Sequence, residues 1–126
     1  MLPLTFDPLP LGSIQPQGWL LDQMQLMADG LAGNEYNFYM YVNQSSWLGG
    51  DEEYSDLNEA FGYWFNGLVP LAYGLNDEGL KSQVQAAANY VHDHQQADGW
   101  SVPRFYSKYL WLTALLGWEM KLEVRE

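Results

Sequence analysis

Carboxylates and tryptophans are the residues of this sequence whose types and spacing could do chemistry. The segment SSWLGGDEEYS, residues 45–55, places Trp47 and two glycines directly before Asp51, Glu52 and Glu53. Loops that carry an aromatic residue commonly serve recognition. A tryptophan beside carboxylates suits a sugar ring, so the pattern predicts a ligand-recognition loop.

Two further carboxylates and a second tryptophan lie in comparable surroundings. Trp100 follows Asp98 and Gly99, and, like Trp47, it belongs to no helical period. Each tryptophan therefore either contacts a ligand or anchors its loop on the core. Glu59 and Asp98 are the best-placed single carboxylates, but glycoside cleavage normally needs two acids that flank one bond. We therefore assign no catalytic residue.

The sequence favours no metal site. His92 and His94 are two residues apart, so on a helix they point in different directions and suit solvated or helix-end positions. The acids at 51–53 lack the evenly spaced oxygen ligands of a calcium loop, and we expect a solvated acidic loop near a helix N-terminus. The chain contains no cysteine, which excludes a disulfide, a thiolate nucleophile and a cysteine-bound metal.

Composition limits the class of protein and its partners. The chain has 126 residues, 48% of them hydrophobic, which suits one domain with a real core. Its net charge is −11 with only five Lys and Arg, so we expect neither nucleic acid nor an anionic membrane surface as a partner. The start, MLPLTFDPLPLGS, lacks the basic and apolar regions of a signal peptide, and no apolar stretch is long enough to span a bilayer.

The apolar spacing predicts helices throughout. Residues 1–17 are rich in proline and predict an extended lead-in, followed by a helix over 18–31 with stop signals at Gly30 and Gly33. Its expected apolar face consists of Leu20, Met24, Met27 and Leu31. Asn34 is expected to cap a second helix that ends at Val42.

A third helix has the strongest period in the chain. Ser55 is its expected N-cap, and Pro70 is expected to bend it or free a carbonyl. Trp64 lies on its apolar face and should pack in the core, whereas Tyr63 and Asn66 lie off that face and could line a groove. The apolar face consists of Leu57, Phe61, Trp64, Leu68 and Leu71.

Two more helices complete the pattern. The fourth is expected to start after Asn76 or Asp77 and to run to about Gln96. Its inward positions are Leu80, Val84, Ala87 or Ala88, and Val91. The last, over 105–122, is apolar nearly all round and needs cover on every side, so we expect self-association. No segment has the period of two that strands require, and the chain is predicted to be all-α, built from helical hairpins.

Three segments resemble a known family. PLPLGSIQPQGWLLDQMQLMADGLAG, SSWLGGDEEYSDLNEAFGYWFNGLVPLAYGLND and HQQADGW are similar to the N-terminal part of the β-L-arabinofuranosidase-like glycoside hydrolases, the group around glycoside hydrolase family 127. The resemblance extends from about Pro8 to Trp100, and residues 101–126 diverge from it. It implies part of a six-hairpin (α/α)6 barrel, incomplete in this chain. Only Trp64 and the Asp98-Gly99-Trp100 loop match family positions.

The resemblance also carries an expectation of function. It implies a segment of a glycoside hydrolase that acts on L-arabinofuranosyl or related plant-type glycans, in a family whose members are often secreted. Family enzymes use a cysteine nucleophile beside zinc, and this chain supplies neither that cysteine nor the zinc ligands, so we expect it to be inactive alone. In such barrels the loops at one end of the hairpins surround the sugar. The expected substrate-binding residues are Trp47 as a stacking platform, Asp51 as a hydroxyl acceptor, Glu59, Tyr63, Asp98 and Trp100. The alternatives are a non-catalytic helical module that binds carbohydrate or a protein, and a fragment without activity.

Overall fold

The computed structural model describes residues 9–55, 57–97 and 99. This part of the chain forms helices and no strand, which confirms the all-α prediction. The elements in chain order are α1 (Trp19–Asp29), α2 (Leu31–Phe38), α3 (Met40–Asn43), the short 3-10 helix η1 (Ser46–Leu48), α4 (Glu59–Leu75) and α5 (Glu78–Asp93).

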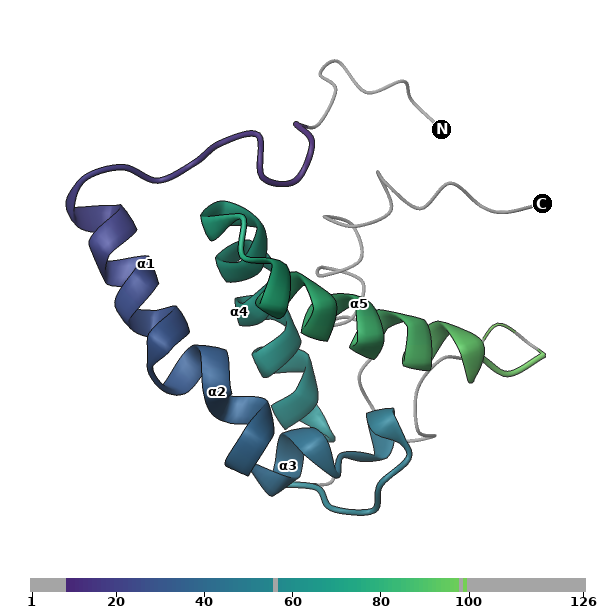
Figure 1. Ribbon diagram of the computed structural model, residues 1–126. Helices are drawn as coiled ribbons and strands as arrows, with labels where there is room; N and C mark the ends of the chain where they lie inside the picture. The colour runs from purple at the N-terminus through teal and green to yellow at the C-terminus, as the bar shows by residue number, and fades with distance from the viewer. Residues whose placement is uncertain (1–8, 56, 98, 100–126) are drawn as a thin grey trace.

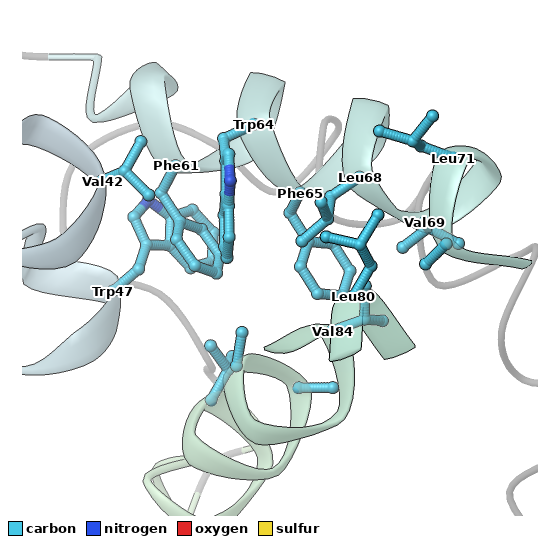
Figure 2. Packing of buried hydrophobic residues seen from close by; sticks show 14 residues of the cluster. Val42, Trp47, Phe61, Trp64, Phe65, Leu68, Val69, Leu71, Leu80 and Val84 are labelled. Atoms are coloured by element: carbon cyan, nitrogen blue, oxygen red, sulfur yellow. The ribbon is translucent and has the colours of Figure 1, made fainter. Parts of the chain in front are cut away.

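Helix α4 is the centre of the structure. It packs against α1, α2, α3 and α5, with α1 and α2 following one another along one side (Figure 1). The Phe61 ring stacks at 5.5 Å on Trp47 and at 5.8 Å on Phe65, so aromatic contacts join the loop before α4 to the core (Figure 2). Trp64 is buried, as its place in the period predicts. The buried residues of α4 are Phe61, Gly62, Trp64, Phe65, Leu68, Val69, Leu71 and Ala72.

The start of α4 differs from the prediction. Ser55 is not the N-cap: its Oγ accepts a hydrogen bond from Leu57 N at 3.1 Å in a turn that precedes the helix. Asn58 occupies the cap position in the left-handed region, with φ 51°. The helix therefore begins at Glu59, and Leu57, predicted to face inward, is exposed. At the other end, α4 continues through Pro70 to Leu75.

The predicted second helix is divided into two. α2 begins at Leu31 rather than after Asn34, and it ends at Phe38 because Tyr39 adopts an extended conformation, with ψ 103°. Asn34 lies inside α2, where its Nδ2 donates to the carbonyls of Gly30 and Asp29 at 2.9 and 3.2 Å. It therefore satisfies carbonyls at the end of α1 instead of capping a following helix.

Helix α5 agrees closely with its predicted start and face. Asp77 is its N-cap, and Oδ1 accepts from Leu80 N at 2.9 Å. The helix ends at Asp93, three residues before the predicted end. All of its expected inward residues are buried against α4: Leu80, Val84, Ala87, Ala88 and Val91.

Helix α1 is the least buried of the long elements. None of its residues is buried, and Met24 and Ala28 alone among them pack partly against the core. The predicted inward face is wrong in part, because Leu20 and Met27 are exposed and Leu31, now in α2, is 74% exposed. Trp19 is 76% exposed. α1 therefore presents apolar side chains outward.

Two predicted segments lie outside the described residues: the helix over 105–122 and the first eight residues of the lead-in. Residues 9–18 form no helix, as the prolines predict. Of the helices that the structure describes, none has the length and apolarity to cross a membrane.

Candidate functional site

One carboxylate closes the 45–55 loop. Glu53 Oε1 accepts hydrogen bonds from Ser45 Oγ at 2.8 Å, from Ser46 N at 2.7 Å and from Ser46 Oγ. Backbone bonds from Gly50 N to Ser45 O and from Glu52 N to Gln44 O, both 3.0 Å, tie the same ends together. Glu53 Oε2 is buried without a hydrogen-bond partner within the described structure. Glu53 is therefore a structural residue of the loop, and only part of the expected acidic cluster faces solvent.

Trp47 lies in the core rather than on the surface. Its side chain is 3% exposed, its ring stacks on Phe61, and its Nε1 donates to Asn58 O at 2.8 Å. Figure 2 shows the indole beside Phe61 and Val42. A ring in this position has no open face for a sugar, so the expectation of a stacking platform is corrected. The geometry supports the alternative, in which Trp47 anchors its loop.

Asp51 is exposed at the outer side of the same loop. It follows two glycines that the loop requires: Gly49 has φ 83°, and a Cβ on Gly50 would lie 1.9 Å from Gln44 O. A Cβ on Gly49 would also lie 2.1 Å from Tyr90 Oη, because the loop closely approaches α5. Asp51 is accessible to a ligand, but it lines neither of the two hollows described below.

The candidate site is a groove between α2 and α4. Its volume is about 400 Å³, within the range of ligand pockets. It combines two carboxylates, Glu35 and Glu59, with three tyrosines. The lining residues are Met27, Ala32, Glu35, Tyr39, Tyr54, Glu59, Ala60, Tyr63, Trp64, Gly67 and Leu68.

The two groove carboxylates have different surroundings. Burial raises the pKa of Glu35 above the ordinary value, because desolvation disfavours the charged carboxylate. Glu59, in the first turn of α4, accepts a hydrogen bond from Ser55 Oγ at 2.6 Å. The dipole of α4 also favours a negative charge there. The raised pKa of Glu35 suits a carboxyl group that donates a proton.

The tyrosines give the groove its aromatic surface. Tyr63 is 63% exposed and Tyr54 is 65% exposed. The ring of Tyr41 meets those of Tyr54 and Tyr39 edge-on, at centroid distances of 5.8 and 5.4 Å. This edge-to-face pair of contacts orders the rim of the groove. Glu59 and Tyr63, both predicted to contact substrate, thus lie together in the groove, on the face of α4 that Ser55 and Tyr54 approach. Asn66, which was predicted with Tyr63 to line a groove, does not line it.

A second hollow of about 450 Å³ lies between α3 and α5. None of the described residues that line it is charged, and its polar groups are amides and hydroxyls. Its lining residues are Tyr36, Asn43, Leu48, Ser82, Gln83, Ala86, Ala87 and Tyr90. We take the α2–α4 groove as the candidate site because, of the two, it is the one lined by described carboxylates, one of which has a raised pKa.

The Asp98-Gly99-Trp100 segment is described only at Gly99. Gly99 has φ 83°, and Gln95 Nε2 donates to its carbonyl at 2.8 Å. Asp98 and Trp100 lie outside the described residues. If both tryptophans contact a sugar, Trp47 and Trp100 must lie at the same end of the helical hairpins. Trp100 lies outside the described residues, so this placement stays a prediction.

The histidines occupy the end of α5, as expected. His94 is the C-cap, its Nδ1 lies 2.8 Å from Tyr90 O, and its ring stacks on Tyr90 at 4.0 Å. Within residues 9–55, 57–97 and 99, no three His, Asp or Glu residues come together in a way that could hold a metal ion.

Sequence reasoning missed three residues of the groove: Glu35, Tyr39 and Tyr54. The crowding of Tyr36, Phe38, Tyr39 and Tyr41 was a signal, because so many aromatics on one short helix cannot all be buried. The break at Tyr39 turns this residue toward α4, and no local pattern predicts that break.

Comparison with protein-family models, with curated proteins and with solved structures finds no match to this chain.

Proposed function

We propose that this chain is the N-terminal segment of a six-hairpin glycosidase-like protein, and that the groove between α2 and α4 binds a carbohydrate. The observation that carries the proposal is the meeting of exposed tyrosines with two carboxylates in one open groove. Aromatic faces pack on the apolar face of a sugar ring, and carboxylates accept hydrogen bonds from its hydroxyl groups.

The groove suits a small part of a glycan. Its volume of about 400 Å³ is at the lower end for ligand pockets, which fits one or two sugar units. The resemblance favours L-arabinofuranosyl or related plant-type glycans. In this proposal Tyr63 is the stacking surface, and Glu59 and Glu35 are the hydroxyl partners. Asp51, Asp98 and Trp100 remain proposed contacts outside the groove.

The proposal places the chemical step outside this chain. The zinc–cysteine centre implied by the resemblance needs cysteines, and the sequence has none. The chain alone is therefore expected not to hydrolyse aryl β-L-arabinofuranosides. Turnover that survives chelation and repurification would contradict this part of the proposal.

The test is a titration of the protein with arabinofuranosyl oligosaccharides, in which NMR measures the binding. We expect a dissociation constant in the millimolar range, about −4 kcal/mol, because one ring and two carboxylates form a small contact. Tyr63→Ala should weaken binding about fivefold, or ~1 kcal/mol, since its exposed ring is removed without a cavity in the core.

Phe38→Ala is the matched control, because Phe38 is an exposed aromatic of α2 that does not line the groove. It should leave the affinity unchanged. Equal losses from the two substitutions, or no binding of any oligosaccharide by the folded protein, would overturn the proposal.

A second candidate function is a helical module that binds a partner protein. The specific observation in its favour is the outward apolar surface of α1 and the start of α2, which includes Trp19 and Leu31. Exposed apolar patches of this kind mark interaction surfaces.

A further inference from the structure

The charge in the groove is of one sign. Among the described residues, Glu35 and Glu59 are its charged lining residues, and no described Lys, Arg or His lines it. Lys81 is the single Lys or Arg in the part of the chain that the structure describes. Its Nζ lies 2.7 Å from Glu78 Oε1 and 2.6 Å from Asn76 Oδ1, at the start of α5. The groove carboxylates are therefore not neutralised by any described cation.

The surroundings of the groove carboxylates strengthen their attraction for a cationic ligand. Glu35 is partly desolvated, and its raised pKa reflects the missing compensation of its charge. A positive group beside it would supply that compensation, and more so in a groove that excludes part of the water. Tyrosine faces also attract an ammonium group through the ring quadrupole. Carboxylates and tyrosines together form the kind of surface that selects a cation.

We infer that the groove prefers an amine-bearing saccharide, in which the ammonium group pairs with Glu35 and Glu59 while the sugar ring packs on Tyr63. The inference rests on the proposed function and adds the charge class of its ligand. A uronic acid or sulfated sugar would bring a third negative charge into the groove and is excluded by repulsion. A neutral sugar packs on Tyr63 and donates hydroxyl hydrogen bonds to the carboxylates but forms no ion pair, and it is the weaker ligand.

The experiment compares three trisaccharides that differ in charge: glucosamine, N-acetylglucosamine and galacturonic acid oligomers. Binding is measured by NMR near pH 6.5, below the ~7.7 typical of an α-amino group, so that the amines are largely protonated. We expect the glucosamine trimer to bind at least about tenfold tighter than the N-acetylated one, and the galacturonic trimer not to bind. The ratio should fall as salt is added, because screening weakens exposed ion pairs.

Substitutions distinguish the effect of the groove carboxylates on binding from that of the overall charge of −11, which attracts any cation weakly. The double substitution Glu35→Gln and Glu59→Gln should bring the ratio between the two trimers close to one, because the glutamine amide oxygen still accepts hydrogen bonds from hydroxyl groups but carries no charge that pairs with the ammonium group. Asp93→Asn is the control, because Asp93 is exposed at the end of α5 and does not line the groove. It should leave the ratio as in the parent protein. Circular dichroism establishes that each variant is folded.

The outcomes distinguish the inference from the proposed function. If the N-acetylated trimer binds as tightly as the glucosamine trimer, or if the preference survives the double substitution, the inference is overturned and sugar binding stands. If the folded protein binds none of the three trimers, the inference fails. The proposed function fails only if arabinofuranosyl oligosaccharides also do not bind.

Discussion

At the scale of single residues, three hydrogen bonds that converge on one oxygen of Glu53 decide the shape of the 45–55 loop. The sequence presents three adjacent acids as equivalent, yet Asp51 is exposed and Glu53 is turned inward. The difference arises because Ser45 is fully buried, and its hydroxyl needs an acceptor there. Within this acidic run, Asp51 thus faces solvent, whereas Glu53 holds the loop together.

Glu53→Ala should destabilise the protein by about 2 kcal/mol. The substitution leaves the buried Ser45 hydroxyl and the Ser46 amide without their hydrogen-bond acceptor. It also removes the buried Oε2, which has no partner, and this gain in free energy offsets only part of the loss. Urea denaturation measures the difference. Glu52→Ala is the control, since no hydrogen bond to the Glu52 side chain is described, and it should change the free energy of unfolding by less than ~0.5 kcal/mol.

Glu35→Gln should stabilise the protein near neutral pH. The pKa of Glu35 is raised in the folded state, so the folded protein binds the proton more tightly than the unfolded chain does. Its contribution to stability is therefore present below the unfolded pKa and is lost as the pH rises through the folded pKa. Glutamine stays neutral and avoids that loss.

Unfolding at about pH 7 and about pH 3.5 tests this prediction. The gain from Glu35→Gln should be present at the higher pH and decrease at the lower one. Asp93→Asn controls for the general relief of negative charge in an acidic protein. Equal gains from the two variants would show that burial of Glu35 has no separate effect.

At the scale of the elements, the sequence predicted the helix features that depend on contacts between neighbouring residues. The cap at Asp77 and the inward face of α5 follow from neighbouring residues, and both are confirmed. The late start of α4 involves a residue of the preceding loop, because Trp47 Nε1 donates to Asn58 O, and Tyr39, where α2 ends, packs against the core. The groove was predictable only through Glu59 and Tyr63, because Glu35 and Tyr39 reach it by the packing of α2 on α4.

Two glycines inside helices should respond oppositely to alanine. A Cβ on Gly33 would lie 1.8 Å from Ala28 O, where α2 approaches α1, so Gly33→Ala should destabilise by at least about 2 kcal/mol. A Cβ on Gly67 meets nothing within 4 Å, so Gly67→Ala should stabilise α4 by about 0.5–1 kcal/mol. Thermal and urea unfolding measure both, and effects of the same sign would contradict the close approach of the two helices.

At the scale of the whole molecule, apolar surface and negative charge act against one another. The outward side chains of α1 favour association, while the charge of −11 keeps copies apart. The expectation from sequence placed the exposed apolar surface on residues 105–122, which the structure does not describe. α1 is an independent reason for the same expectation.

We therefore expect concentration-dependent self-association that strengthens with salt, because screening weakens the repulsion between copies. Sedimentation velocity over a range of concentrations measures it. Replacing Trp19 and Leu31 together by serine should reduce the association, since both side chains are more than 70% exposed. A parent protein that remains strictly monomeric at high concentration and high salt would count against an interaction surface on α1.

The central position of α4 has a consequence for amide hydrogen exchange. Because α1, α2, α3 and α5 all pack on α4, the opening of any one of them leaves the others in place over its backbone. The amides on its buried face should therefore exchange only through global unfolding, while those of α1, which buries none of its residues, should exchange through local fraying. Exchange followed by NMR should give α4 the free energy of unfolding of the whole domain and give α1 a much smaller value.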